Sequence, residues 1–221
     1  PCDLRKHVFT DFNTLQYNQV FGGSNEAFHE VWWFYCSSGA SSIDRYVVYN
    51  YLEDIWYYGS MARTAWLDSG LRSFPLAATY NSLLVDHENG IDDNETSTSA
   101  AISAFITSAE FDLDDGHQFM LMSRVLPDVS FEGSTADSPV INMTFFPLNA
   151  SGSGYNSPTS ESGVNTGAVT RSATSPVEAY TSQIHTRVRG RQMSMKIESS
   201  TTGVQWQLGA PRVDLRADGR R

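Results

Sequence analysis

Hydrophobic and aromatic residues occur in four short runs between residues 28 and 67, and the stretches between the runs are polar and turn-like. The runs cover residues 31–35, 46–49, 55–58 and 64–67. Short connectors favour antiparallel strands over parallel strands joined by helical crossovers. The pattern therefore predicts an antiparallel meander of four strands in one sheet, which is the unit of a β-propeller blade.

A second candidate blade starts at residues 74–80 and continues through residues 83–88. Two blades cannot close a propeller, which needs about four or more. We therefore expect partial β-propeller blades in residues 1–98, with either further sequence upstream or another chain on which this region docks. The chain begins with Pro1 and not with methionine, as expected of a processed product or of the carboxy-terminal part of a longer protein.

Residues 89–100 combine turn formers with charges and mark the predicted boundary between two domains, 1–98 and 99–221. In the second domain apolar and polar residues alternate, which predicts strands with one buried and one solvated face. About six such strands predict a β-sandwich-like region, so the whole chain is expected to be all-β. Residues 99–107 could instead form a short helix. The apolar residues of each strand that share a parity are Phe105, Ala109, Phe111 and Leu113; Val125, Val129 and Phe131; Ile141, Met143 and Phe145; Val204, Trp206 and Leu208; and Val213 and Leu215.

The apolar face of the chain changes sides at Gly190. Before it, Ile184 and Val188 occupy one parity and three arginines the other; after it, the apolar side consists of Met193, Met195 and Ile197. A change of faces in a period-two pattern needs an extra residue or a bend. Glycine at this position therefore predicts either a β-bulge or a strand that crosses between sheets.

A long polar segment, residues 149–176, is rich in serine, threonine and glycine and holds few apolar residues. Such a segment cannot form a core of its own. We expect a long loop that is mobile or is held by a partner.

Charge is uneven along the chain, whose formal net charge is −10. Residues 187–221 hold 8 lysines and arginines against 3 acidic residues, a net charge of +5, so the remainder carries −15. A basic end attracts anionic groups, whereas the acidic remainder repels DNA. The candidate contacts to carboxylates of neighbouring subunits or to DNA phosphates are five arginines, whose planar guanidinium suits both groups. They are Arg187, Arg189, Arg191, Arg212 and Arg216.

The sequence lacks the motifs of common catalytic and cofactor sites. Cys2 and Cys36 form no CxxC pair, and no GxSxG, P-loop or GxGxxG motif is present. Residues 112–116 are one residue too short for a calcium-binding EF-hand loop, and a turn that closes a hairpin explains them better. No apolar run approaches the ~20 residues of a membrane-spanning helix. We expect no enzymatic activity, no cofactor and no metal site.

The residues leave two further functions open besides a structural role. Carboxylates at Asp86, Glu88, Glu110 and Asp112, with aromatic side chains at Trp32, Trp56, Tyr57 and Tyr58, could make a carbohydrate-binding or glycan-cleaving tail appendage, which would be trimeric. Aromatic residues at strand spacing are, however, more often core or interface residues. The second of these functions is that of an isolated β-sandwich adhesion module of a larger protein.

Three segments carry a resemblance to a known family. In chain order they are IWYYGSMARTAWLDSG (residues 55–70), DGHQFMLMSRVLPDVSFEGST (115–135) and RVRGRQMSMKIESSTTGVQWQLGAPRVDLRADGRR (187–221). They resemble the carboxy-terminal portion of the tail-nozzle and packaged-DNA-stabilisation (tail hub) proteins of short-tailed bacteriophages. Proteins of that family are considerably longer and carry a propeller-bearing amino-terminal portion.

The resemblance implies a structural protein of the virion, located in the phage tail. Such a protein is a subunit of a hexameric ring beneath the portal and adaptor, where it extends the DNA channel and helps retain and release the genome. The implied partners are further copies of the chain, the adaptor and portal, tail fibre or spike proteins and, transiently, double-stranded DNA. No catalysis is implied.

Overall fold

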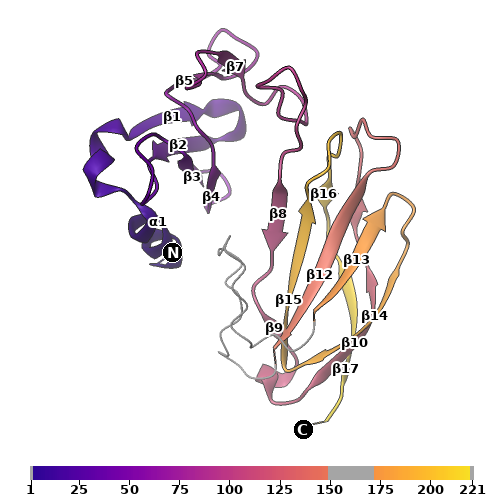
Figure 1. The fold of residues 1–221 in the computed structure, drawn as a ribbon. Helices are drawn as coiled ribbons and strands as arrows, with labels where there is room; N and C mark the ends of the chain where they lie inside the picture. Colours follow the sequence, from indigo (N-terminus) through magenta and orange to yellow (C-terminus); the bar gives the residue numbers. More distant parts are fainter. Residues whose placement is uncertain (1, 149–171, 220–221) are drawn as a thin grey trace. The chain divides into compact units, whose positions relative to one another are not determined.

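The computed structural model describes residues 2–148 and 172–219, which fold mostly into antiparallel β-sheets (Figure 1). The chain divides into two compact units, Pro1–Gly90 and Ile91–Arg221; the predicted division, after residue 98, lies further along the chain. No helix in the described residues is long and apolar enough to cross a membrane, and no closed propeller is present in them. The helices in these residues are α1 (Cys2–Asp11) and three 3₁₀ helices, η1 (Thr14–Gln19), η2 (Glu26–Phe28) and η3 (Asp114–Gly116).

The first unit contains the predicted meander, but its membership differs from the prediction. The four strands run in the order β1-β2-β3-β4, and the apolar run at residues 64–67 is not among them. The fourth member is β1, which was not predicted because its sequence, FGGSN, has no apolar alternation. The bounds are β1 (Phe21–Asn25), β2 (Glu30–Tyr35), β3 (Arg45–Asn50) and β4 (Ile55–Ser60).

The run at residues 64–67 starts a second sheet of the first unit, with the order β5-β6-β7. Its Trp66 stacks on Trp32 of β2 with ring centroids 5.2 Å apart, and Trp66 Nε1 donates a hydrogen bond of 2.7 Å to the Ser24 carbonyl of β1. A Cβ atom at Gly23 would lie 2.3 Å from this indole, so β1 needs glycine where the two sheets meet. The bounds are β5 (Ala65–Leu67), β6 (Leu76–Ala78) and β7 (Leu84–Asp86).

The second unit contains a five-stranded sheet, a three-stranded sheet and one strand pair; we call the first two the two larger sheets. The larger sheet has the order β13-β12-β15-β8, with β9 also pairing with β15; the smaller has the order β14-β10-β17; and β11 pairs with β16. Residues 104–107 form a strand, which rules out the helix considered for residues 99–107. The bounds are β8 (Ala104–Thr107), β9 (Phe111–Asp112), β10 (Met120–Leu126), β11 (Val129–Ser130), β12 (Val140–Leu148), β13 (Ala173–Glu178), β14 (Ile184–Gly190), β15 (Gln192–Ser199), β16 (Gln207–Leu208) and β17 (Arg212–Ala217).

Two predicted segments need correction. The polar loop was expected to extend to residue 176, but residues 173–176 belong to β13 and pair with β12; residues 149–171 lie outside the described residues. The turn at residues 114–116 forms, with positive φ at Asp114 (51°) and Gly116 (69°). It does not close a hairpin, because β9 and β10, which flank it, belong to different sheets.

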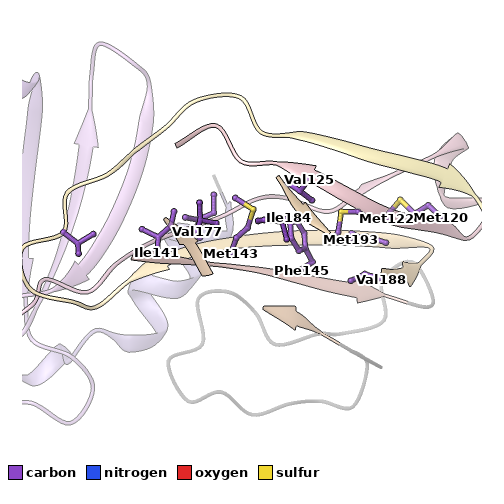
Figure 2. Packing of buried hydrophobic residues seen from close by; sticks show 12 residues of the cluster. Met120, Met122, Val125, Ile141, Met143, Phe145, Val177, Ile184, Val188 and Met193 are labelled. Atoms are coloured by element: carbon purple, nitrogen blue, oxygen red, sulfur yellow. The ribbon is translucent and has the colours of Figure 1, made fainter. Parts of the chain in front are cut away.

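Both larger sheets contribute to one buried core, so they face each other across it (Figure 2). Met120 and Met122 from β10 and Phe145 from β12 are fully buried in it. The predicted parity is confirmed for β12, β15 and β17, because the apolar residues expected on their buried faces lie in or against this core. It is wrong for Phe105 of β8, which is 53% exposed. The remaining fully or largely buried members are Val125, Ile141, Met143, Val177, Ile184, Val188, Met193, Ile197 and Val204.

The chain passes from one sheet to the other at Gly190. Strand β14 ends at Gly190 in the smaller sheet, β15 begins at Gln192 in the larger one, and only Arg191 separates them. A Cβ atom at Gly190 would lie 2.9 Å from both Gln192 O and Pro147 Cβ. Glycine is therefore required by close packing where the strand crosses between sheets, which is the second of the two structures predicted for this position.

Candidate functional site

The outward surface of the smaller sheet is the candidate site. Ile184 and Val188 of β14, and Val213 and Leu215 of β17, pack in or against the core, so the residues between them point to the opposite side of the sheet. That side carries five arginines. We call them the basic face: Arg187 and Arg189 from β14, Arg124 from β10, and Arg212 and Arg216 from β17.

Strand pairing fixes the spacing of the basic face. Leu121, on the central strand β10, pairs with Arg189 on one side and with Arg216 on the other. The Cα atoms of these two arginines are thus two strand spacings apart, roughly 10 Å. Arg212 pairs with Leu126 further along β10. Apolar side chains therefore lie between the charges, and Leu126 is 38% exposed.

Arg124 is the member of the basic face that the sequence did not reveal. The ladder of β10 shifts register between Met122 and Arg124, so one extra residue separates the buried Met122 from the buried Val125. Strict alternation therefore fails in this strand. The uneven spacing of Met120, Met122 and Val125 is the only signal in the sequence that could have indicated the bulge.

Two arginines of the basic face have partners within the chain. Arg124 Nη2 lies 3.6 Å from Asp214 Oδ2. Arg189 Nε lies 2.5 Å from Asp218 Oδ2, its Nη2 donates a 3.0 Å hydrogen bond to the Asp218 carbonyl, and its guanidinium lies 4.1 Å from the centroid of the Phe119 ring. Internal partners therefore balance these two charges.

The other three, Arg187, Arg212 and Arg216, are exposed and make no ion pair or hydrogen bond through their side chains within residues 2–148 and 172–219. With five arginines against Asp214 and Asp218, the basic face has a net charge of +3. The chain as a whole has a net charge of −10. The basic face is thus a local reversal of sign that can attract anionic groups.

The sequence predicts Arg191 as a candidate contact residue together with Arg187 and Arg189, but Arg191 lies outside β14, at the crossing between the sheets. Its Nη1 donates hydrogen bonds to the carbonyls of His117 (2.9 Å) and Gly116 (3.3 Å). Its guanidinium lies 4.6 Å from the centroid of the Phe119 ring. Arg191 therefore attaches the crossing to the turn at η3. It belongs to neither β14 nor β17, but its guanidinium shares the Phe119 ring with that of Arg189.

A second polar cluster lies in the first unit around Glu30, a buried residue that the sequence analysis did not single out. The Glu30 carboxylate accepts hydrogen bonds from Trp32 Nε1 (3.0 Å) and from the Tyr57 hydroxyl. Asn25 Nδ2 lies 3.5 Å from Glu30 Oε2 and 3.4 Å from Glu88 Oε1. Asn25 Oδ1 is buried and has no hydrogen-bond partner among the described residues. Burial and then the charge of Glu30 raise the pKa of Glu88. Burial and then the hydrogen bond to Glu30 raise the pKa of Tyr57.

The other candidate carboxylates are divided between the two units. Asp86 pairs with Arg72 at 3.3 Å in the first unit, whereas Asp112 accepts a hydrogen bond of 2.9 Å from Gln192 in the second. Within the described chain, no group of three histidine, cysteine, aspartate or glutamate side chains could hold a metal ion. Cys36 is buried with a free thiol, and burial raises its pKa.

The aromatic side chains suggested for sugar stacking are engaged within the protein. Trp32 is 5% exposed, and Tyr57 packs against the core of the first unit. Trp56, 43% exposed, stacks on Trp33 and on Tyr49 with centroid distances of 5.8 and 4.5 Å. Because these rings stack on one another, fewer ring faces are left for a sugar.

No protein-family model matches the chain, and no curated protein matches it either. The assignment of a function therefore rests on the residues and the geometry described above.

Proposed function

We propose that the chain is a structural subunit of the tail nozzle or hub ring of a short-tailed bacteriophage. The ring extends the DNA channel below the portal and adaptor, and helps retain and release the genome. The observation that carries this proposal is the basic face, where three arginines have no ion-pair partner among the described residues although the chain is otherwise acidic.

Two of the three resembling segments include strands of this sheet. Residues 115–135 include all of β10, while residues 187–221 include all of β17 and the arginine-bearing part of β14. The resemblance and the basic face thus involve the same three strands. This agreement supports a role of the sheet in the assembly that the resemblance implies.

The fold suits a ring subunit. We interpret the β1–β4 meander as a propeller-blade-like element and the two larger sheets of the second unit as a β-sandwich-like domain. Many short strands around a core give a stiff building block. The acidic remainder lets DNA pass without adhering, because like charges repel.

The partners that follow are further copies in a hexameric ring, the adaptor and portal, tail fibre or spike proteins and, transiently, double-stranded DNA. The location is the virion, and the role is structural and not enzymatic. The basic face supplies contacts to carboxylates of neighbouring proteins or to DNA phosphates.

A symmetry-resolved electron cryomicroscopy reconstruction of the native particle tests the proposal. We expect a closed ring of this chain around an axial channel, between the adaptor and the distal end of the tail. A particle in which the chain is a monomer, or lies away from the channel axis, would refute the proposal.

A further inference from the structure

The turn between β3 and β4 presents an unusual set of side chains to solvent. The four residues of the turn and the first two residues of β4 are all exposed, and these six combine four apolar side chains with two carboxylates. We call this segment the acidic tip: Tyr51 (49% exposed), Leu52 (65%), Glu53, Asp54, Ile55 (54%) and Trp56 (43%).

The acidic tip is held in one conformation by its own hydrogen bonds. Asn50 Oδ1 accepts from the backbone nitrogens of Leu52 (3.1 Å) and Glu53 (2.9 Å). Asp54, with φ of 54°, accepts a 3.0 Å hydrogen bond from the Tyr49 hydroxyl. A turn fixed in this way loses little conformational entropy when it binds a partner.

Single exposed apolar residues are common on protein surfaces, but a contiguous group usually marks a binding site. Tyrosine and tryptophan, here Tyr51 and Trp56, contribute most to the binding energy of protein interfaces, together with arginine. A partner for the acidic tip should therefore offer apolar surface together with positive charge.

We propose that the acidic tip of one copy of the chain binds the basic face of a second copy. This inference rests on the proposed ring and names the two surfaces that join its subunits. The charges are complementary, because Glu53 and Asp54 meet a surface of net charge +3. The apolar parts match as well, since Leu121 and Leu126 lie between the arginines of the basic face.

The arginines supply a further contact. Arg189 and Arg191 both stack on the ring of Phe119 within the chain, whereas Arg187, Arg212 and Arg216 have no described aromatic partner. The exposed ring of Tyr51 in the acidic tip offers these three the same cation–π contact.

Symmetry also favours this pairing. A contact between two basic faces would bring like charges together, so a two-fold dimer through this surface is opposed. The acidic tip and the basic face are different surfaces of one chain, and their pairing is therefore heterologous. Heterologous contacts generate closed rings when the rotation between subunits closes.

A charge-swap experiment on the full chain tests the inference. We expect Arg216→Glu alone, and Glu53→Arg alone, each to weaken self-association by about tenfold or more, because each places like charges opposite one another. The double variant should recover association. Glu132→Arg, which makes the same charge change at an exposed turn residue of the second unit, is the matched control and should leave association unchanged.

Association is measured by sedimentation velocity over a range of protein concentrations, together with binding of a short DNA duplex by each variant. If both single variants associate as the unsubstituted chain does, the inference is wrong while the ring stands. If Arg216→Glu loses only DNA binding, the basic face contacts DNA and the inference is also wrong. If the unsubstituted chain forms no ring either in solution or in the particle, the proposed function fails with it.

Discussion

Arg189 and Arg216 lie on the two edge strands of one sheet, and both pair across the ladder with the same residue, Leu121. Their side chains nevertheless have different surroundings. Arg189 is bonded to Asp218 and stacked on Phe119, whereas Arg216 is exposed without an ion pair to the described residues. The same substitution at these two positions should therefore separate a stabilising role from a binding role.

Arg189→Ala should lower the free energy of unfolding of the second unit by on the order of 1 kcal/mol, because an exposed ion pair and a cation–π contact are lost. Arg216→Ala should leave that free energy unchanged. Urea denaturation followed by circular dichroism measures both. Equal stability of the two variants would mean that the contacts of Arg189 contribute nothing in solution.

Association should respond in the opposite order. Arg216→Ala removes a charge that has no ion-pair partner in the described part of the chain, so it should weaken self-association more than Arg189→Ala does. Sedimentation velocity on the same two variants provides the comparison. A larger loss of association for Arg189→Ala would contradict the assignment of the two roles.

Gly190→Ala should destabilise the second unit by about 1–3 kcal/mol, because the added Cβ overpacks the crossing between the sheets. The expected contacts are backbone oxygens and Pro147, which cannot easily move away. Gly39→Ala is the matched control, since a Cβ at Gly39 meets nothing within 4 Å and its φ is not positive. Thermal unfolding of both variants is the measurement, and similar melting temperatures would refute the steric argument.

The stability of the first unit should depend on pH through Glu88. Its pKa is raised in the folded chain, so the folded state binds the proton more tightly than the unfolded state does. Unfolding free energy should thus increase as the pH falls through the raised pKa, and the gain should be complete below the ordinary glutamate value. The effect should be small, because Glu88 as a whole remains exposed.

Glu88→Gln should remove this part of the pH dependence and stabilise the first unit at neutral pH. Urea denaturation at pH 7 and pH 5, on the substituted and unsubstituted chains, is the test. Glu53→Gln, at an exposed turn position, serves as the control for a general change of charge. An equal pH dependence in the Glu88→Gln chain would show that other groups cause it.

The thiol of Cys36 should be unreactive in the folded chain, because it is buried and its pKa is raised. In a Cys2→Ser background, labelling by a thiol reagent should therefore report unfolding of the first unit. Rapid labelling under native conditions would contradict this burial.

Period-two alternation was sufficient to predict most of the second unit. Met193, Ile197 and Val213 each lie on the side of their strand that the alternation assigns to the core. Alternation succeeds here because each sheet has one buried and one solvated face, so that a shift of one residue would expose the apolar set.

The same reasoning failed where a contact between distant residues determines the structure. Strand β1 contains Gly23, which leaves room for the indole of Trp66, and no apolar pattern in the sequence indicates this contact. Arg124 was missed because a bulge changes the parity of β10. Glu30 was missed because a single carboxylate in an aromatic strand gives no indication that Tyr57 and Asn25 will meet it.

The crossing at Gly190 has a mechanical consequence. The strand that carries Arg187 and Arg189 continues, after a single residue, as a central strand of the opposite sheet. In the proposed ring, a force applied to these arginines by a neighbouring subunit would therefore be transmitted along the backbone into the hydrogen-bonded ladder of β15 with β12. The two layers resist such a load together, because one cannot slide over the other without breaking that ladder or stretching the one-residue link.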